Sequence, residues 1–273
     1  MNAIVKTTLC PLHRSPESCS ELVDEALYGM IVEVVAVYGG DWVHVRTHYR
    51  YEGWAPRACL LMEDQAARTW QALPKRVVLH KNACDVMAAP KVQSWILATL
   101  PLGGVLSPQG EPEDGWQKVR LCDGQEGYTR SSFLAEYYKS PPEEEELALR
   151  RRIVANAWRY QGAHYRWGGK SPMGIDCSGL VSMAYLLSGI IIYRDAHIRE
   201  DFPIHEITLD QAKPGDLLFF PGHVAMYLGD GRYCHSTGRA GDDGFTVNSL
   251  DPAAPDYRAD LAEKITAVGS YFS

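Results

Sequence analysis

The chain has 273 residues, of which 46% are hydrophobic and 22% are charged, so it can form one large domain or two to three smaller ones, each with its own core. Its formal net charge of −7 repels phosphate backbones, which argues against a nucleic-acid partner. No stretch is apolar over the roughly 20 residues that a membrane-spanning helix needs, so we expect no membrane partner.

The first residues, MNAIVKTTLCPLHRS, show no apolar segment behind a basic start and no small-residue cleavage site, so they do not read as a secretory signal. The seven cysteines are scattered along the chain without the close, even spacing of a disulfide framework. We therefore expect free thiols and a cytoplasmic protein.

Short runs rich in β-branched and aromatic residues, separated by Gly and Asp turns, predict an all-β region up to about residue 139. This region repeats itself at an offset of 74 positions without gaps. The identical pairs are Cys10/Cys84, Pro16/Pro90, Gly29/Gly103, Trp42/Trp116, Val45/Val119, Arg46/Arg120, Glu52/Glu126, Gly53/Gly127 and Leu60/Leu134. We predict two small β domains, 1–64 and 75–139, joined by the connector EDQAARTWQALPK.

Each copy closes on Gly and an aromatic residue followed by a Leu, in EGWAPRACL and EGYTRSSFL. This ending resembles that of bacterial SH3-like barrels. The copies differ where Glu21 aligns with Trp95 and Tyr51 with Gln125. These differences are either drift at exposed loop positions or polar groups that one copy keeps for an active site.

The segment SPPEEEELALRRRIV marks the start of a third domain, 143–273, with Ser140 as a cap and Pro141 and Pro142 at a helix start. The pattern predicts a helix from Glu143 to about Tyr160 and a second helix that opens at Cys177 or Ser178. Downstream, GDLLFF, HVAMYLG and RYCHS predict three strands joined by tight turns.

A cysteine in the first turn of a helix lies near the positive end of the helix dipole, which favours the nucleophilic thiolate of Cys177. The interval between His223 and His235 suits neighbouring strands of a hairpin, and we expect both imidazoles near one end of one face. His223 could then act as the base, with His235 orienting its ring. Cys234 points away from His235 in a strand and is expected in the core.

The same three residues, Cys177, His223 and His235, could instead be zinc ligands. However, no close Cys–Cys or His–His pair accompanies them, and the spacing is a poor match to known zinc sites. We therefore predict a catalytic site with no metal and no other cofactor.

Four ordered motifs, YRWGGKSPMGIDCSGL, PGDLLFF, GHVAMYLGDG and YCHS, resemble those of the NlpC/P60 family of papain-like cysteine peptidases. The resemblance implies an α+β catalytic domain with Cys177 as nucleophile, His223 as base and His235 as the third polar member. It also implies that the Tyr165 hydroxyl and the Cys177 backbone N–H hold the oxyanion.

The tandem SH3-like domains narrow the resemblance to the YkfC-like branch of γ-D-glutamyl-L-diamino acid endopeptidases, which cut murein peptides that carry a free N-terminal L-Ala. The branch implies substrate contacts from Asp176, Ser178, Asp195, Tyr51 and Glu21. Asp24 and Glu25 lie close to Glu21 and leave open which acid meets the substrate amine. Ala196 and Arg199 depart from the common pattern, where Ser and Gln are found.

We therefore expect a cytoplasmic cysteine peptidase that cleaves the γ-D-Glu–diamino acid bond of murein tripeptides or tetrapeptides during recycling. Two alternatives remain, a secreted hydrolase of intact peptidoglycan and a non-catalytic module that binds cell-wall peptides. No protein partner is inferred. The sequence leaves open whether the diamino acid is diaminopimelate or lysine, which peptide length is preferred, the oligomeric state and the docking of the domains.

Overall fold

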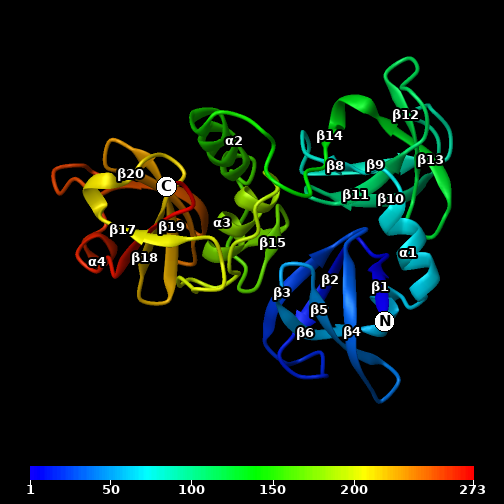
Figure 1. The fold of residues 1–273 in the computed structure, drawn as a ribbon, viewed down its shortest axis with the longest axis horizontal. Coiled ribbons are helices and arrows are strands. Elements are labelled where there is room, and N and C mark those ends of the chain that lie inside the picture. Colours follow the sequence, from blue (N-terminus) through cyan, green and yellow to red (C-terminus); the bar gives the residue numbers. More distant parts are fainter. The chain divides into compact units, whose positions relative to one another are not determined.

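The computed structural model describes residues 1–273, and its internal contacts divide the chain into two units, Met1–Tyr137 and Tyr138–Ser273. Figure 1 shows β sheets in the first unit and a mixture of helices and strands in the second. No helix is both long and apolar enough to cross a membrane. The predicted class, two N-terminal antiparallel β sheets followed by an α+β domain, is confirmed.

The N-terminal unit contains two seven-stranded sheets with corresponding strand orders, β3-β2-β6-β5-β4-β1-β7 and β10-β9-β13-β12-β11-β8-β14. The first sheet comprises β1 (Asn2–Val5), β2 (Leu9–His13), β3 (Leu22–Leu27), β4 (Ile31–Tyr38), β5 (Trp42–Thr47), β6 (Glu52–Pro56) and β7 (Leu60–Leu61), with the 3₁₀ turn η1 (Arg57–Cys59). The second comprises β8 (Arg76–Val78), β9 (Ala83–Met87), β10 (Ile96–Pro101), β11 (Val105–Pro108), β12 (Trp116–Arg120), β13 (Glu126–Arg130) and β14 (Leu134–Glu136), with η2 (Ser131–Phe133).

The constant offset predicted from the sequence is present in the strands themselves. Adding it to the bounds of β2, β3, β6 and η1 gives the bounds of β9, β10, β13 and η2. The main difference is that β4 continues to Tyr38, whereas its counterpart β11 ends at Pro108. A proline has no N–H for the strand ladder, which accounts for the shorter strand.

The connector between the repeats forms a helix, α1 (Asp64–Ala72), for which the sequence analysis predicted no element. Its Trp70 side chain is only 2% exposed, and the indole N–H donates a 2.8 Å hydrogen bond to the carbonyl of Gly29. Gly29 has a positive φ of 79°, and a Cβ there would collide with Val105 of the second sheet. The Trp70 side chain of the connector therefore packs against the turn at which Gly29 approaches Val105 of the second sheet.

Further contacts join the two sheets directly. The backbone N–H of Val105 donates to the carbonyl of Tyr28 (3.0 Å), and the Thr8 hydroxyl donates to the carbonyl of Thr99 (2.8 Å). The backbone N–H of Cys122 donates to the Tyr28 hydroxyl (3.2 Å). These bonds make the two sheets parts of one compact unit.

The C-terminal unit is built on a six-stranded antiparallel sheet of order β17-β22-β18-β19-β20-β21. Its elements are α2 (Glu146–Trp158), β15 (Lys170–Ser171), β16 (Gly174–Ile175), α3 (Cys177–Leu186), β17 (His205–Ile207), η3 (Leu209–Gln211), β18 (Leu217–Phe220), β19 (His223–Gly229), β20 (Arg232–Thr237), β21 (Gly244–Ser249), α4 (Ala259–Ala262) and β22 (Ala267–Ser270). The three strands predicted downstream of Cys177 are confirmed as β18, β19 and β20.

Helix α2 begins at Glu146, later than the predicted start at Glu143, and Ser140 does not cap it. The Ser140 carbonyl instead packs against Gly189, after α3. Glu145 is extended and occupies the N-cap, and the Glu144 carboxylate bonds Arg152 twice at 2.8 Å from outside the helix. Of the acidic run, only Glu146 therefore lies within α2, in its first turn. The other three glutamates precede the helix.

Helix α3 is apolar on all sides and lies in the core of the C-terminal unit, in contact with α2, β19 and β20. Leu180, Met183, Ala184 and Tyr185 are completely buried. The side of α3 that faces β19 brings its first residue, Cys177, to the strand that starts with His223. The packing of one helix on one hairpin therefore positions the site.

Trp70→Ala is expected to destabilise the N-terminal unit by about 3–5 kcal/mol, because it leaves a cavity beside Gly29 and an unpaired Gly29 carbonyl. Trp95→Ala is the matched control, since Trp95 is 74% exposed, and should change stability by less than about 0.5 kcal/mol. Urea unfolding of the full chain followed by circular dichroism measures both. Equal effects of the two substitutions would contradict the role given to α1.

Candidate functional site

Cys177 occupies the first position of α3, as the sequence predicts. Asp176 is the N-cap residue, and one of its carboxylate oxygens accepts a 2.5 Å hydrogen bond from the backbone N–H of Gly179. An aspartate is favoured here because it satisfies a backbone donor that the helix itself cannot. The backbone N–H of Cys177 lies in the same first turn, where no preceding turn supplies an acceptor.

Two glycines allow the start of α3 to approach the preceding loop. A Cβ on Gly179 would collide with the carbonyl of Gly169, and a Cβ on Gly169 would collide with Gly174. Neither position has room for a side chain. Gly169 of YRWGG and Gly179 of DCSG are therefore required by the close packing around the nucleophile.

A buried arginine holds this turn in place. Arg194 donates to both carboxylate oxygens of Asp176 at 3.0 Å and to the Ser178 hydroxyl at 2.7 Å. Because a buried charge is costly unless it is paired, these bonds stabilise one arrangement of the residues on either side of Cys177. Asp176 and Ser178 therefore support the nucleophile, while their predicted contacts with substrate stay a prediction.

The two predicted histidines meet across the β19–β20 hairpin. His223 Nε2 lies 2.7 Å from His235 Nδ1, and His235 Nε2 lies 2.8 Å from the side-chain oxygen of Asn248 on β21. The Asn248 amide nitrogen donates in turn to the carbonyl of Asp256 at 2.8 Å. The expectation that both imidazoles share one end of one face is confirmed.

The thiol lies beside this chain of hydrogen bonds. The Cys177 sulfur accepts a hydrogen bond from the backbone N–H of Val224, the residue after His223. His223 uses Nε2 for His235, which leaves Nδ1 as the ring nitrogen that can receive the thiol proton. The arrangement is a nucleophile, a base and an orienting group in series.

Burial keeps the thiol and both imidazoles neutral. It raises the pKa of Cys177 to about 11, assisted by the neighbouring Asp176 carboxylate. Burial also lowers the pKa of His223 to about 3 and that of His235 to about 4. Burial of the Cys177 sulfur therefore acts against the helix dipole, which favours the thiolate. The thiol therefore needs a base at the moment of attack.

Tyr165 lies close enough to Cys177 and Asp176 for their charges to act on its hydroxyl. Burial, followed by those two groups, raises the pKa of Tyr165. Its ring packs against Gly238, where a Cβ would come within 3.1 Å. The phenol therefore remains a hydrogen-bond donor at neutral pH, which is the property that an oxyanion partner needs.

Both ring nitrogens of His235 are hydrogen-bonded, one to His223 and one to Asn248, so neither is open to a metal ion. The structure shows no group of three His, Cys, Asp or Glu side chains arranged to hold a metal. Cys234 is completely buried, as predicted from its place in the strand.

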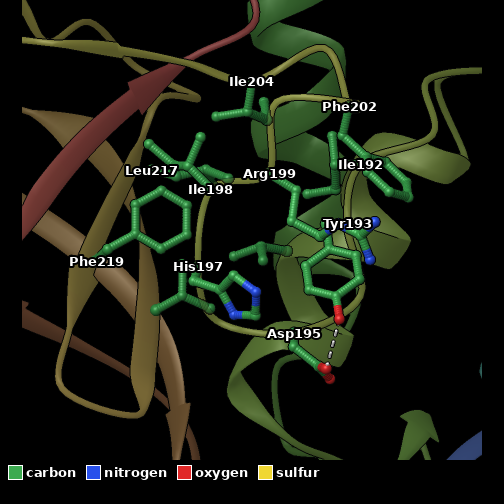
Figure 2. A pocket seen from close by; sticks show the side chains of 12 residues that line it. Ile192, Tyr193, Asp195, His197, Ile198, Arg199, Phe202, Ile204, Leu217 and Phe219 are labelled. Atoms are coloured by element: carbon green, nitrogen blue, oxygen red, sulfur yellow. Dashed lines mark hydrogen bonds between the residues drawn. The ribbon is translucent and has the colours of Figure 1, made fainter.

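Asp195 lines a small, mostly apolar pocket close to the nucleophile, together with Val181 and Val224. Its carboxylate accepts a 3.1 Å hydrogen bond from the Tyr193 hydroxyl, shown as a dashed line in Figure 2. Tyr193 also lines the pocket, and the remaining lining residues are Ile192, His197, Ile198, Arg199, Phe202, Ile204, Leu217 and Phe219. The departure from the family pattern at Arg199 therefore falls on the wall of this pocket.

Glu21 and Tyr51 lie in the N-terminal unit, whereas the other predicted site residues lie in the C-terminal unit. Glu21 forms a 2.5 Å ion pair with Arg14, and the backbone N–H of Tyr51 donates to the Thr47 hydroxyl. Asp24 is buried and accepts a 2.6 Å bond from the Tyr49 hydroxyl, and Glu25 is also buried. Contributions of these residues to the site stay predictions.

The sequence analysis missed two residues of the site. Arg194 directly precedes the predicted residue Asp195, and no motif in the sequence predicts its ion pair with Asp176. Asn248 lies one strand beyond His235, and nothing in its spacing predicts the pairing. The register of β20 with β21, in which Tyr233 lies opposite Asn248, places it diagonally to His235 on the same face.

Known protein families match both parts of the chain. The model of the NlpC/P60 family matches residues 162–255, and that of the bacterial dipeptidyl-peptidase Sh3 domain matches residues 12–60. The second match agrees with the SH3-like interpretation of the first sheet.

Dipeptidyl-peptidase 6 of Lysinibacillus sphaericus is 47% identical over 275 residues, covering all of both chains. Gamma-D-glutamyl-L-lysine dipeptidyl-peptidase of Bacillus cereus is 27% identical over 80% of this chain and 68% of its own. A crystal structure of an NlpC/P60 family protein from Bacillus cereus superposes over the whole of both chains with a TM-score of 0.81 at 22% identity, which shows a shared fold.

The buried histidines predict an acid-sensitive fold. An unfolded histidine binds a proton below about pH 6.5, whereas His235 in the folded protein does so only below about pH 4. Between these values the unfolded state binds more protons, so stability falls as the pH falls. His235→Asn keeps a donor and an acceptor but does not titrate. From pH 7 to pH 5 the free energy of unfolding should therefore fall in both proteins, and the fall should be on the order of 2 kcal/mol smaller in His235→Asn than in the wild type.

Urea unfolding at the two pH values checks this expectation. His205→Asn is the matched control, because it makes the same substitution at an exposed histidine on β17, and the two variants are compared at both pH values. An unchanged slope for His235→Asn would show that His235 is not held neutral by the fold.

Proposed function

Because the chain belongs to the NlpC/P60 family and is a cysteine peptidase, we propose that it hydrolyses the bond between γ-D-Glu and the diamino acid of murein peptides with a free N-terminal L-Ala. The observation that carries the proposal is the series of Cys177, His223 and His235 at the start of α3 and across one hairpin. A module that only binds peptides has no need of a thiol beside a base whose ring is held in place.

The reaction proceeds in two halves. His223 Nδ1 takes the thiol proton as the Cys177 sulfur attacks the γ-carbonyl carbon of D-Glu, and the oxygen of that carbonyl becomes an oxyanion. Donation from the Tyr165 hydroxyl and the Cys177 backbone N–H stabilises it. When the C–N bond breaks, protonated His223 gives its proton to the leaving amine of the diamino acid, and a thioester remains on Cys177.

Water completes the cycle. His223 takes a proton from the water that attacks the thioester carbonyl, and the breaking C–S bond leaves a thiolate that regains the proton from His223. The products are a free γ-carboxyl on the L-Ala-γ-D-Glu dipeptide and the restored thiol. Since burial holds the resting pair neutral, a proton moves only as the bonds to carbon form or break.

The names of the relatives support the choice of bond. The full-length relative from Lysinibacillus sphaericus is a dipeptidyl-peptidase, and the Bacillus cereus relative is named for a γ-D-glutamyl-L-lysine bond. A dipeptidyl-peptidase cleaves after the second residue of its substrate. In a stem peptide with a free N-terminus, those two residues are L-Ala and γ-D-Glu. The proposed reaction therefore releases this dipeptide from the rest of the stem peptide.

Binding of a free N-terminal amine would fix the position of the peptide, so that the bond after the second residue lies at the nucleophile. A buried ammonium group needs anionic and hydrogen-bonding partners, and an acylated nitrogen leaves those partners unpaired. Asp195 provides a carboxylate on the wall of the pocket that also contains Val224, the residue after His223, and we propose that this carboxylate pairs with the ammonium group. We propose that Glu21 and Tyr51 of the N-terminal unit complete the contacts with the amine, and that Asp176 and Ser178 meet the peptide closer to the cut.

The same requirement supports a role in recycling. Stem peptides still joined to the glycan have their L-Ala nitrogen in an amide bond, so they present no ammonium group. We propose that the enzyme acts in the cytoplasm on tripeptides or tetrapeptides already released from the glycan. Hydrolysis of intact peptidoglycan would need a site that tolerates the acylated nitrogen.

Purified protein is expected to cleave L-Ala-γ-D-Glu-diamino acid peptides and to cleave their N-acetylated forms at least about 10²-fold more slowly in kcat/KM, because the amine partners are then unpaired. Mass spectrometry of the products gives both the bond and the rate, with lysine and diaminopimelate peptides tested in parallel. Cys177→Ala is the control for contaminating activity.

Equal cleavage of free and acetylated peptides, or release of peptides from intact sacculi, would overturn this proposal in favour of a wall hydrolase. Binding of the peptides without turnover would favour the non-catalytic module.

A further inference from the structure

We propose that Asn248 is a positioning residue for catalysis, which fixes the tautomer of His235 and, through His235, the tautomer of His223. The Asn248 side chain contacts His235 and the carbonyl of Asp256, so it acts on the base through His235. It lies at the far end of the series that starts at Cys177, with only 6% of its surface exposed. Its effect on the base follows from the direction of three consecutive hydrogen bonds.

The first bond sets the orientation of the amide. The backbone carbonyl of Asp256 can only accept a hydrogen bond, so the Asn248 side-chain atom 2.8 Å from it must be the NH₂ group. The amide oxygen then faces His235 Nε2 at 2.8 Å. A flipped amide would place an oxygen against the Asp256 carbonyl and lose that bond.

The second and third bonds pass this direction to the base. An amide oxygen accepts, so the neutral ring of His235 carries its proton on Nε2 and has a lone pair on Nδ1. That lone pair accepts from His223 at 2.7 Å, so His223 carries its proton on Nε2. The lone pair of His223 is therefore on Nδ1, the nitrogen left for the Cys177 thiol. The opposite tautomer would turn a donor toward the thiol and disable the base.

Burial allows only one set of tautomers in this series, because solvent does not reach the His235 ring to satisfy another. His235 is completely buried, and burial keeps both rings in their neutral forms. A neutral imidazole has one donor and one acceptor, so no bond in the series can be reversed alone. In water, solvent would satisfy either tautomer.

The end of the series is fixed by the backbone after β21. Tyr257 forms a parallel bridge with Ser249, the last residue of that strand. Asp256 also forms a 2.9 Å ion pair with Arg232 at the start of β20. The chain therefore folds back on the hairpin and holds the Asp256 carbonyl opposite Asn248.

The experiment reads the tautomers directly by ¹⁵N NMR of the full-length protein labelled in histidine. In the wild type without substrate, His223 and His235 should both be protonated at Nε2 and unprotonated at Nδ1. Asn248→Leu should give His235 a mixture of tautomers. It should lower kcat by about 10²-fold, the range of a lost general base, with KM unchanged.

Asn248→Asp keeps an acceptor facing His235, so it should retain the Nε2–H tautomer and recover part of the lost kcat. Val247→Ala is the matched control, because Val247 lies next to Asn248 on β21 but pairs with Cys234, on the opposite face of the sheet from His235. It should leave the tautomers and kcat unchanged.

A wild-type spectrum with either histidine protonated at Nδ1 would overturn the proposal. Unchanged histidine tautomers in Asn248→Leu would also overturn it, whatever the activity of that variant, because the role of Asn248 would then be structural. The inference rests on His223 as the base of the proposed reaction, but the spectrum needs no substrate. An error in the proposed substrate would appear as missing turnover in the wild type, and the tautomers would still be measured.

Discussion

Burial of the polar groups around Cys177 is the constraint on which the rest of the site depends. Away from water, each donor and acceptor needs a partner within the protein. On one side of the nucleophile the Asp176 carboxylate is satisfied by the turn of α3 and by Arg194. On the other side, the histidines are satisfied by each other, by Asn248 and finally by a backbone carbonyl. The same burial keeps the thiol and the imidazoles neutral until a substrate carbonyl arrives.

The fold supplies these partners from distant parts of the chain. The first turn of α3 provides Cys177 and its cap, and the segment after α3 provides Arg194. Three neighbouring strands, β19, β20 and β21, provide His223, His235 and Asn248 in that order. A loss of register in this sheet would break the series, since a slip by a single position turns each side chain to the opposite face. The stability of the sheet and the chemistry of the site are therefore linked.

The sequence predicts those features of the fold and the site that have a local or periodic signal. The gapless internal repeat predicts two similar sheets, and the short interval between His223 and His235 predicts a hairpin pair. The role of Asn248 depends on the register between β20 and β21 and on the fold of the chain after Ser249, which leave no mark in spacing.

The state of the Cys177 thiol depends on how much water the folded chain excludes. A helix start favours the thiolate, whereas burial acts in the opposite direction by raising the pKa of Cys177. The contributions of Glu21 and Tyr51 to the site stay predictions, because these residues belong to the N-terminal unit and Cys177 belongs to the C-terminal unit.

The central claim is that Cys177 carries the acyl group between the two halves of the reaction. The most direct test is rapid quenching in acid during turnover of an L-Ala-γ-D-Glu-diamino acid peptide, followed by digestion and mass spectrometry of the seven cysteines. We expect an L-Ala-γ-D-glutamyl thioester on Cys177 and on no other cysteine. Turnover by Cys177→Ala at the wild-type rate, or a thioester on another cysteine, would contradict it.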